Sequence, residues 1–194
     1  MDAKELQKRY ATGERNFSKI NLQRARLVGA SLKNIRLNEA NLIHANLADA
    51  ELNNAYLNKA DLSDTILSRT QMSNAYLSGA NLTKMTAMQS ALDNCNLMGA
   101  NLSKVNFKEV ILNNANLSKA NLTGASLNLK VYFKRANLSN ANLSNANLTN
   151  ADLEYADLSG ANLTNANLFN ANLTNTNLSN AIFSKTIMPD GSIR

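Results

Sequence analysis

The chain has 194 residues, of which 44% are hydrophobic but only 5% are aromatic, and it contains no Trp. A compact core of this size normally uses more large aromatic side chains, so the composition argues against a conventional globular core. The formal net charge is +6, a lone Cys excludes a disulfide framework, which fits a cytoplasmic protein, and no apolar run is long enough to span a membrane.

Residues 2–13 predict a short helix at the start of the chain. Asp2 suits the N-cap, and Glu5 three residues later completes a capping-box pattern. Leu6 and Tyr10 share one face at i, i+4, and Gly13 favours a helical stop. The segment is charged and lacks the apolar stretch of a secretory signal. It is also short for a membrane-surface helix, so we interpret it as a cap on the structure that follows.

The rest of the chain is organised by a five-residue period. A central residue recurs at every fifth position from Phe17 to Leu127 and again from Phe133 to Met188, and 28 of these 35 residues are Leu. Ala usually stands two residues earlier and Asn or Asp one residue earlier. In an α-helix, residues five apart differ in direction by about 140°, so the Leu side chains would be spread around the whole axis. In a flat strand, residues five apart would point to opposite faces.

Bending of the chain resolves this conflict. If the chain turns by about a right angle after each pentapeptide, every Ala–Leu pair points to a common axis, and four bends close a coil of 20 residues. Such coils stack at the strand spacing of about 4.8 Å, with hydrogen bonds between them.

The pattern is clearest from Asn137 to Leu178, where Ala-Asn-Leu and Ala-Asp-Leu triplets follow one another. It resembles the A(D/N)LXX motif of the pentapeptide-repeat family, in particular its stand-alone cyanobacterial members, over residues 16–188. The resemblance implies an all-β fold, a right-handed quadrilateral β-helix with four pentapeptides per coil. We therefore expect a short N-terminal α-helical cap in residues 1–14, the β-helix in residues 15–188 and a C-terminal tail in residues 189–194.

One irregularity interrupts the repeat, because the step from Leu127 to Phe133 is six residues. The extra residue lies within 128–130, and the register slip falls near residues 128–132. We predict a local bulge with the β-helix continuous on both sides. Whether the slip marks a fusion of two ancestral arrays or a functional bulge stays open.

Stacking by coils predicts which residues are neighbours. In one central column Ala87 is small, and we expect the oversized Met85 and Phe107 to fill the space. Asn and Gly two residues after each central position are typical of corners with positive φ, and stacked Asn side chains can hydrogen-bond between coils. The same register places Tyr56 over Tyr76. It also predicts the ion pairs of Lys19 with Glu39, Glu39 with Lys59, and Asp49 with Arg69.

No constellation for catalysis is present, and we expect neither enzymatic activity nor a cofactor or metal. The lone His44 occupies an outward corner without a metal-ligand partner, and Cys95 replaces a small buried Ala. Asp152 and Asp157 occupy the Asn/Asp position of the motif, where their role is structural.

Two surface regions are candidates for partner binding. Residues 1–36 hold nine Lys or Arg against three Asp or Glu, whereas residues 37–194 hold eleven of each, so the positive charge belongs to one end. The candidate residues are Arg24, Arg26 and Arg36 at that end, and Lys130, Tyr132, Lys134 and Arg135 beside the register slip.

These features favour a non-enzymatic scaffold that binds another, unidentified protein along one face of the β-helix. The alternative is nucleic-acid binding through the basic N-terminal coil. Some proteins of the family resemble duplex DNA and bind DNA gyrase, but this mimicry needs an acidic surface, so the charge of this chain disfavours it.

The C-terminal coil carries Ile182, Phe183, Ile187 and Met188, and no helical cap follows it. An exposed apolar end favours self-association, so a homodimer through this coil is one expectation. The other is a monomer whose tail, residues 189–194, folds back over the last coil.

Overall fold

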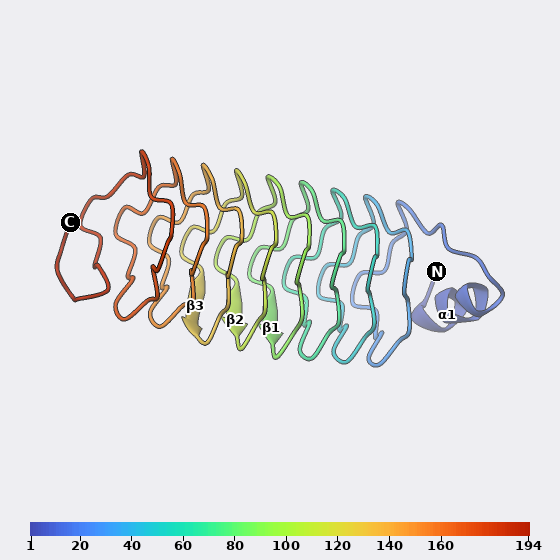
Figure 1. The fold of residues 1–194 in the computed structure, drawn as a ribbon. Coiled ribbons are helices and arrows are strands. Elements are labelled where there is room, and N and C mark those ends of the chain that lie inside the picture. The colour runs from blue at the N-terminus through green and yellow to red at the C-terminus, as the bar shows by residue number, and fades with distance from the viewer.

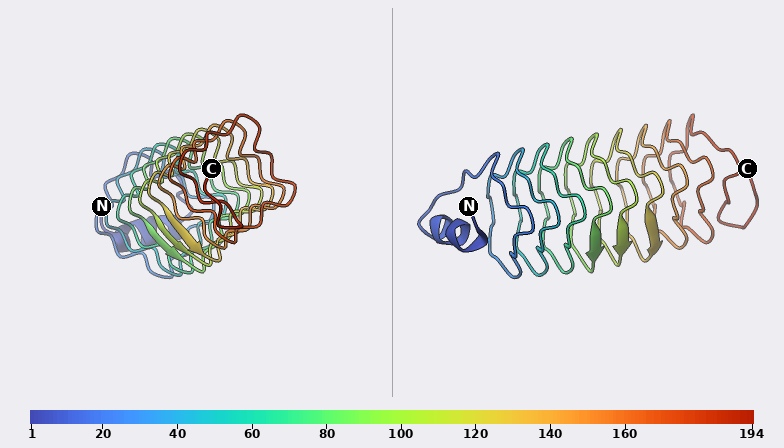
Figure 2. Two further views of the ribbon diagram at one scale, coloured as in Figure 1. Left: turned by 90° about the vertical axis from the view of Figure 1, so that its left-hand side faces the viewer. Right: turned by 180° about the vertical axis from the view of Figure 1, so that it is seen from behind.

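The computed structural model describes residues 1–194, and the chain forms a rod of stacked coils (Figure 1). A single helix lies at the N-terminal end of the rod, and the C-terminus lies at the opposite end. When the rod is turned toward the viewer, coils of similar outline lie one behind another, and the view from behind shows the same regular spacing (Figure 2). The lateral surface is therefore built from columns of side chains that repeat once per coil.

The coils are held together by parallel pairing between residues 20 apart. Tyr56, for example, pairs with both Arg36 and Tyr76. Before the last coil, the amides of the central residues donate to carbonyls in the next coil, as Leu37 N does to Tyr56 O at 2.7 Å, while Asn41 N donates back to Ile20 O at 2.9 Å. The 20-residue register predicted from the five-residue period is thus present along the rod.

Each pentapeptide ends in a corner with a left-handed backbone. The residue two positions after a central residue has a positive φ everywhere except after Leu127 and Met188, for example 59° at Asn34 and 58° at His44. Asn and Gly adopt this conformation at little cost, which explains their frequency there. Side-chain ladders also form as predicted, since Asn170 Nδ2 donates to Asn150 Oδ1 at 2.6 Å.

Leu and Ala side chains fill the interior of the rod in one continuous core. Where Thr, Ser or Cys replaces the inward Ala, its side chain donates to the carbonyl of a central residue, which lies 23 positions earlier except at Thr65, where it is Leu62 of the preceding pentapeptide. Thr70 Oγ1 donates to Leu47 O at 2.9 Å, and Cys95 Sγ lies 3.0 Å from Met72 O. No buried polar side-chain atom lacks a partner. These inward polar residues therefore cost the core little.

Three short strands form one parallel sheet on one side of the rod, in the order β1 (Thr86–Met88), β2 (Asn106–Lys108) and β3 (Ser126–Leu129). Ala87 pairs with Phe107, and both are buried together with Met85, as the volume argument predicts.

The register shifts between β2 and β3, where Asn106 pairs with Ser126 but Lys108 pairs with Leu129. The extra residue therefore lies before Leu129, at Asn128. Lys130 occupies an ordinary corner with φ 54°. Pairing continues beyond the shift, for instance between Ser126 and Asn147.

The helix α1 spans Ala3–Ala11, and the Asp2 side chain accepts a 2.8 Å hydrogen bond from Glu5 N, so the predicted N-cap is confirmed. Leu6 is fully buried and joins the core of the rod, and Tyr10 packs against that core. Tyr10 also donates its hydroxyl proton to Lys33 O at 2.8 Å, which fixes the helix to the first coil.

At the other end the tail turns back on the last coil. Ile193 pairs antiparallel with Ile187, and Thr186 and Arg194 exchange hydrogen bonds of 3.0 and 2.9 Å. The Arg194 guanidinium lies 4.4 Å from the centroid of the Phe183 ring. The central residues of this coil nevertheless stay partly exposed, whereas central residues further inside the rod are buried.

Candidate binding surfaces

One column of the lateral surface carries an arginine and two tyrosines in successive coils, Arg36, Tyr56 and Tyr76, which we call the arginine–tyrosine ladder. The two rings stack with centroids 4.8 Å apart and planes 7° from parallel, as the 20-residue register predicts. The Arg36 guanidinium carbon lies 5.6 Å from the centroid of the Tyr56 ring. Tyr76 is 42% exposed, so an amphipathic aromatic edge faces the solvent.

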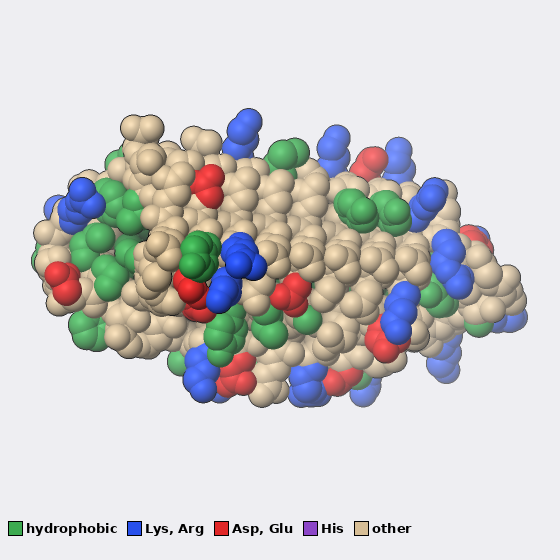
Figure 3. Space-filling model, in the orientation of Figure 1, with side chains coloured by type: hydrophobic (Ala, Val, Ile, Leu, Met, Phe, Trp, Pro, Cys, Tyr) green, Lys and Arg blue, Asp and Glu red, His purple; other side chains and the backbone are tan.

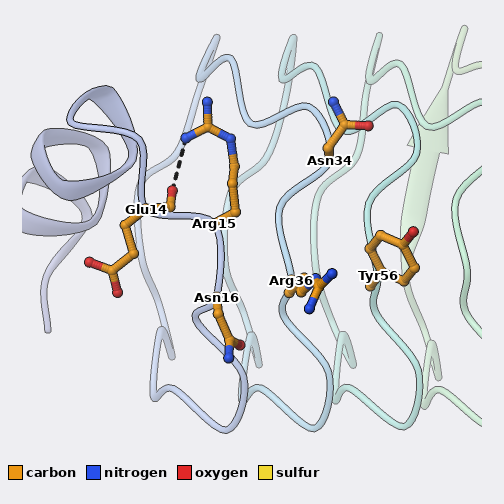
Figure 4. A pocket seen from close by; sticks show the side chains of 6 residues that line it. All are labelled: Glu14, Arg15, Asn16, Asn34, Arg36 and Tyr56. Carbon is orange, nitrogen blue, oxygen red and sulfur yellow. Dashed lines mark hydrogen bonds between the residues drawn. The ribbon is translucent and has the colours of Figure 1, made fainter.

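An open depression of about 500 Å³ adjoins this ladder where the segment after α1 enters the first coil. It is lined by Glu14, Arg15, Asn16, Asn34, Arg36 and Tyr56 (Figure 4).

Two charged side chains of the depression have partners within the chain. Glu14 is bound by the Arg9 guanidinium, with Nε to Oε2 at 2.7 Å, and this contact raises the pKa of Arg9. Arg15 lies 3.8 Å over the Tyr10 ring and donates to Tyr10 O and Glu14 O. Arg36 makes no ion pair. Its guanidinium is therefore available to an external carboxylate or phosphate.

The candidate basic residues of the N-terminal end are divided between two sides of the rod. Arg24 and Arg26 line a second depression, of about 650 Å³, together with the N-cap Asp2 and residues of α1 that include Lys4. Arg36 stands half of a 20-residue coil away from Arg26 along the chain, beside the first depression. The candidate residues of the basic N-terminal end therefore face two different sides, because one coil distributes its residues around the axis.

The candidate residues beside the register slip occupy one side of a coil and its two corners. Lys130 and Arg135 are the corners, each with positive φ, and Tyr132 pairs with Ile111 and Asp152 in its column. Lys134 Nζ forms a 2.6 Å ion pair with Glu154, which raises the pKa of Lys134.

Arg135 lies 5.7 Å from the centroid of the Tyr155 ring. The slip therefore exposes aromatic and basic groups, but the charge of Lys134 is already balanced.

Ion pairs between coils neutralise further charged side chains. Arg69 binds Asp49 through two hydrogen bonds of 2.6 and 2.7 Å, which lower the pKa of Asp49, so this predicted pair is confirmed. Lys19 reaches Glu39 at 3.7 Å, but Glu39 makes no ion pair with Lys59. The sequence reasoning missed the diagonal pair of Lys33 with Glu51, at 3.2 Å, because these residues are 18 apart rather than 20.

Few groups offer reactive chemistry. Cys95 is buried, and desolvation raises the pKa of its thiol to about 12, so it carries no thiolate at neutral pH. His44 is an exposed corner residue, and no group of three or more His, Cys, Asp or Glu side chains is placed to hold a metal ion. The side chains of Asp152 and Asp157 accept hydrogen bonds from Glu154 N and Ser159 N, the structural role that the motif predicts.

The lateral surface is mostly uncharged. In the view of Figure 3, polar side chains and backbone cover most of the rod, hydrophobic side chains lie in small separate groups, and a larger hydrophobic group marks the C-terminal end. None of the helical structure is long and apolar enough to cross a lipid bilayer. The surface thus offers isolated side-chain columns rather than a deep enclosed pocket.

The chain is similar to known proteins in sequence and in structure. The family model described as pentapeptide repeats matches eight copies, over residues 16–50, 45–83, 90–128, 130–165 and 161–190. No curated protein sequence matches the chain.

Among solved structures, HetL, a pentapeptide repeat protein involved in heterocyst differentiation regulation from Nostoc sp. strain PCC 7120, is 35% identical. The match covers 100% of both chains with a TM-score of 0.45. Rfr23 from Cyanothece 51142 is 36% identical over 53% of this chain and 63% of its own, with a TM-score of 0.31. QnrB1, a plasmid-mediated fluoroquinolone resistance protein, is 18% identical over 87% of this chain and 90% of its own, with a TM-score of 0.60.

Proposed function

Because the chain belongs to the pentapeptide-repeat family, we propose that it is a non-enzymatic scaffold that binds a partner protein along the side of its β-helix. The observation that carries this proposal is the arginine–tyrosine ladder. Arg and Tyr are the residue types that most often dominate protein–protein binding energy, and Arg36 has no ion-pair partner of its own. Hydrogen bonds within and between coils hold the ladder, so little ordering entropy is lost when a partner binds.

We also propose the finer geometry of the coils and the role of the N-terminal helix. Each coil is four-sided and right-handed, with one corner per pentapeptide, and α1 acts as the N-terminal cap. Four positive-φ corners in each 20-residue repeat support the square coil. The complete burial of Leu6 supports the cap, because an uncovered first coil would expose apolar side chains. The residues for these parts are 1–14 for the cap, 15–188 for the β-helix and 189–194 for the tail.

Affinity capture with the 194-residue chain tests the proposed function. We expect a protein that is retained after nuclease treatment, and we expect Arg36→Ala combined with Tyr76→Ser to abolish its capture. Arg26→Ala is the matched control, because it removes the same charge from the other side of the rod. A captured protein that is lost equally with both variants, or no captured protein at all, contradicts the proposal.

Nucleic-acid binding through Arg24, Arg26 and Arg36 is the second candidate function, and the charge of the first 36 residues supports it. The separation of these residues onto two sides of the rod weighs against a single phosphate-binding track. A gel-shift assay with a salt titration tests it, because phosphate contacts weaken steeply as salt rises.

Mimicry of DNA toward gyrase is a weaker candidate, since residues 37–194 carry no net charge. An assay of gyrase supercoiling at increasing concentrations of the chain tests it. Inhibition would support the mimicry, and unchanged supercoiling would exclude it.

We also propose that the chain forms a homodimer through its C-terminal coil. The backbone amides of Leu173, Leu178 and Phe183 have no backbone acceptor, so this coil presents a β-edge. The tail covers part of the edge by pairing with Thr186 and Met188. The exposed remainder supports association between two copies.

A further inference from the structure

The sheet β1–β3 carries a second surface, which lies half a coil from the arginine–tyrosine ladder. Its outward column contains Met88, Lys108 and Leu129, which pair in register across the three strands. Met88 is 40% exposed and Leu129 is 47% exposed. Ile66, in the neighbouring column of the preceding coil, is 43% exposed. The register shift before Leu129 places this apolar side chain opposite Lys108, on the outside of the rod.

Lysines surround these apolar side chains. Lys84 and Lys104 are the corner residues that precede β1 and β2, Lys108 lies within β2, and Lys130 follows β3. We call these four lysines with Ile66, Met88 and Leu129 the lysine face. None of the four lysines forms an ion pair.

Two carboxylates lie among these lysines. Asp64 is the corner residue one coil before Lys84, and Glu109 follows β2 and accepts a 2.9 Å hydrogen bond from Gln89 Nε2. The positive charge of the face is therefore only partly balanced within the chain.

Lys84 and Lys104 are neighbours in successive coils, since Lys84 N donates to Ser103 O in the next coil at 3.0 Å. Like charges in adjacent coils repel each other, and such a pair of lysines attracts an external anion. Lys59 and Lys119 are also unpaired corner lysines, but Gly79 and Gly99 separate them in their column. The stacked lysines therefore distinguish this surface from the other corners.

We propose that the lysine face binds an acidic segment of a partner protein, with carboxylates on the lysines and apolar side chains covering Met88 and Leu129. Charge complementarity selects the acidic partner. The exposed apolar column favours a protein over a nucleic acid, because phosphates do not cover apolar side chains and the face carries no aromatic ring for stacking. This surface is independent of the arginine–tyrosine ladder, so a scaffold with both can hold two partners.

Titration of the isotope-labelled 194-residue chain with synthetic peptides, followed by NMR, tests this proposal. The probe is a peptide in which Glu and Leu alternate. We expect its resonance shifts to centre on β1–β3, with binding weakened at least about tenfold, or about 1.4 kcal/mol, by Lys104→Glu with Lys108→Glu. The matched control is Lys59→Glu with Lys119→Glu, which changes the net charge equally on another edge and should leave binding unchanged. Urea denaturation of both variants verifies that they fold.

A second peptide and a further variant separate the contribution of the apolar side chains from that of the lysines. A peptide with Ser in place of Leu should bind more weakly, and Leu129→Ser should weaken only the Leu-containing peptide. Equal loss in both charge variants, or equal binding of the Ser peptide, would overturn the proposal. Tighter binding of a DNA duplex at the same residues would overturn it in favour of a nucleic acid. The Arg36→Ala, Tyr76→Ser variant should bind the Glu–Leu peptide normally, so failure of the proposed function is distinguishable from failure here.

Discussion

Ala87 in β1 pairs in register with Phe107 in β2, so the smallest central side chain of the rod lies beside one of the largest. The pair keeps the volume of two adjacent coils nearly constant, which close-packed interiors require.

We expect Ala87→Leu alone to overpack the column and cost about 1–3 kcal/mol, whereas Phe107→Leu alone leaves a small void. The double variant restores two consensus leucines and should lose less stability than the sum of the single variants. Urea denaturation of the four proteins measures this coupling, expected at about 0.5–3 kcal/mol. Additive losses would show that the two residues pack independently.

Leu148 provides a test of the regular core, because it is buried within the most uniform part of the repeat. Leu148→Ala should lower the free energy of unfolding by about 2–5 kcal/mol through the cavity that remains. Ser144→Ala, on the outside of the preceding pentapeptide, should have a small effect. Equal shifts of the urea midpoint for both variants would contradict the inward assignment of Leu.

Asn145 behaves differently from what its outward position alone suggests. Its φ is 59°, so Asn145→Ala places a β-carbon in the left-handed region and should cost about 1–2 kcal/mol. The corner therefore constrains the backbone of this exposed residue, whose side chain also accepts a 3.3 Å hydrogen bond from Asn165 Nδ2. Asn145→Gly is the matched control and should be close to neutral.

Asp93 supplies a pH-dependent test. Its side chain is half-buried, and desolvation raises the pKa of Asp93 above its ordinary value. A carboxyl whose pKa is higher in the folded state destabilises the fold above that pKa, and the penalty disappears below the pKa of the unfolded chain.

We therefore expect Asp93→Asn to raise the free energy of unfolding at pH 7 and to have no such effect once Asp93 is protonated in both states. Urea denaturation across this pH range measures the difference. A stabilisation that persists at low pH would show that charge is not the cause.

Much of the rod follows from the five-residue period. The stacking of Tyr56 on Tyr76 and the pairing of Asp49 with Arg69 needed only the 20-residue register, because residues 20 apart lie beside each other in successive coils. The separation of Arg26 from Arg36 was present in the same register, since ten residues make half a coil.

Other features depend on contacts outside the repeat. The depressions beside Arg24 and Arg36 form where α1 meets the first coils, and the pentapeptide pattern does not specify how a helix docks. The pairing of Ile193 with Ile187 belongs to a tail that has no repeat. Long side chains also pair between coils with residues that are not 20 positions away, as Lys33 does with Glu51. These parts of the candidate sites therefore could not be predicted from the sequence.

Deletion of single residues tests the bulge at the register slip. Deleting Leu129 leaves Asn128 and Lys130 as the last two residues of a normal pentapeptide, so stability should be preserved. Deleting Lys130 instead moves Leu129 into a corner with positive φ, at a cost of about 1–2 kcal/mol. Thermal unfolding of the two deletion variants compares them. Severe loss of stability in both would show that the six-residue step is required by the fold.

The C-terminal coil leads to the last prediction. Leu173, Leu178 and Phe183 are only partly buried, and their amides lack backbone acceptors, so a second copy can cover apolar side chains and complete hydrogen bonds together. We expect light scattering at micromolar concentration to give twice the 21.1 kDa mass of one chain. Phe183→Asp should give the mass of a monomer, because the contact would bury an unpaired carboxylate.

Met98→Asp is the matched control, since it places the same charge on an exposed apolar position of the lateral surface. It should remain dimeric if the contact lies at the C-terminal coil. A wild-type chain with monomer mass, or a Phe183→Asp variant that stays dimeric, would exclude this interface and leave the folded-back tail as the cover of the last coil.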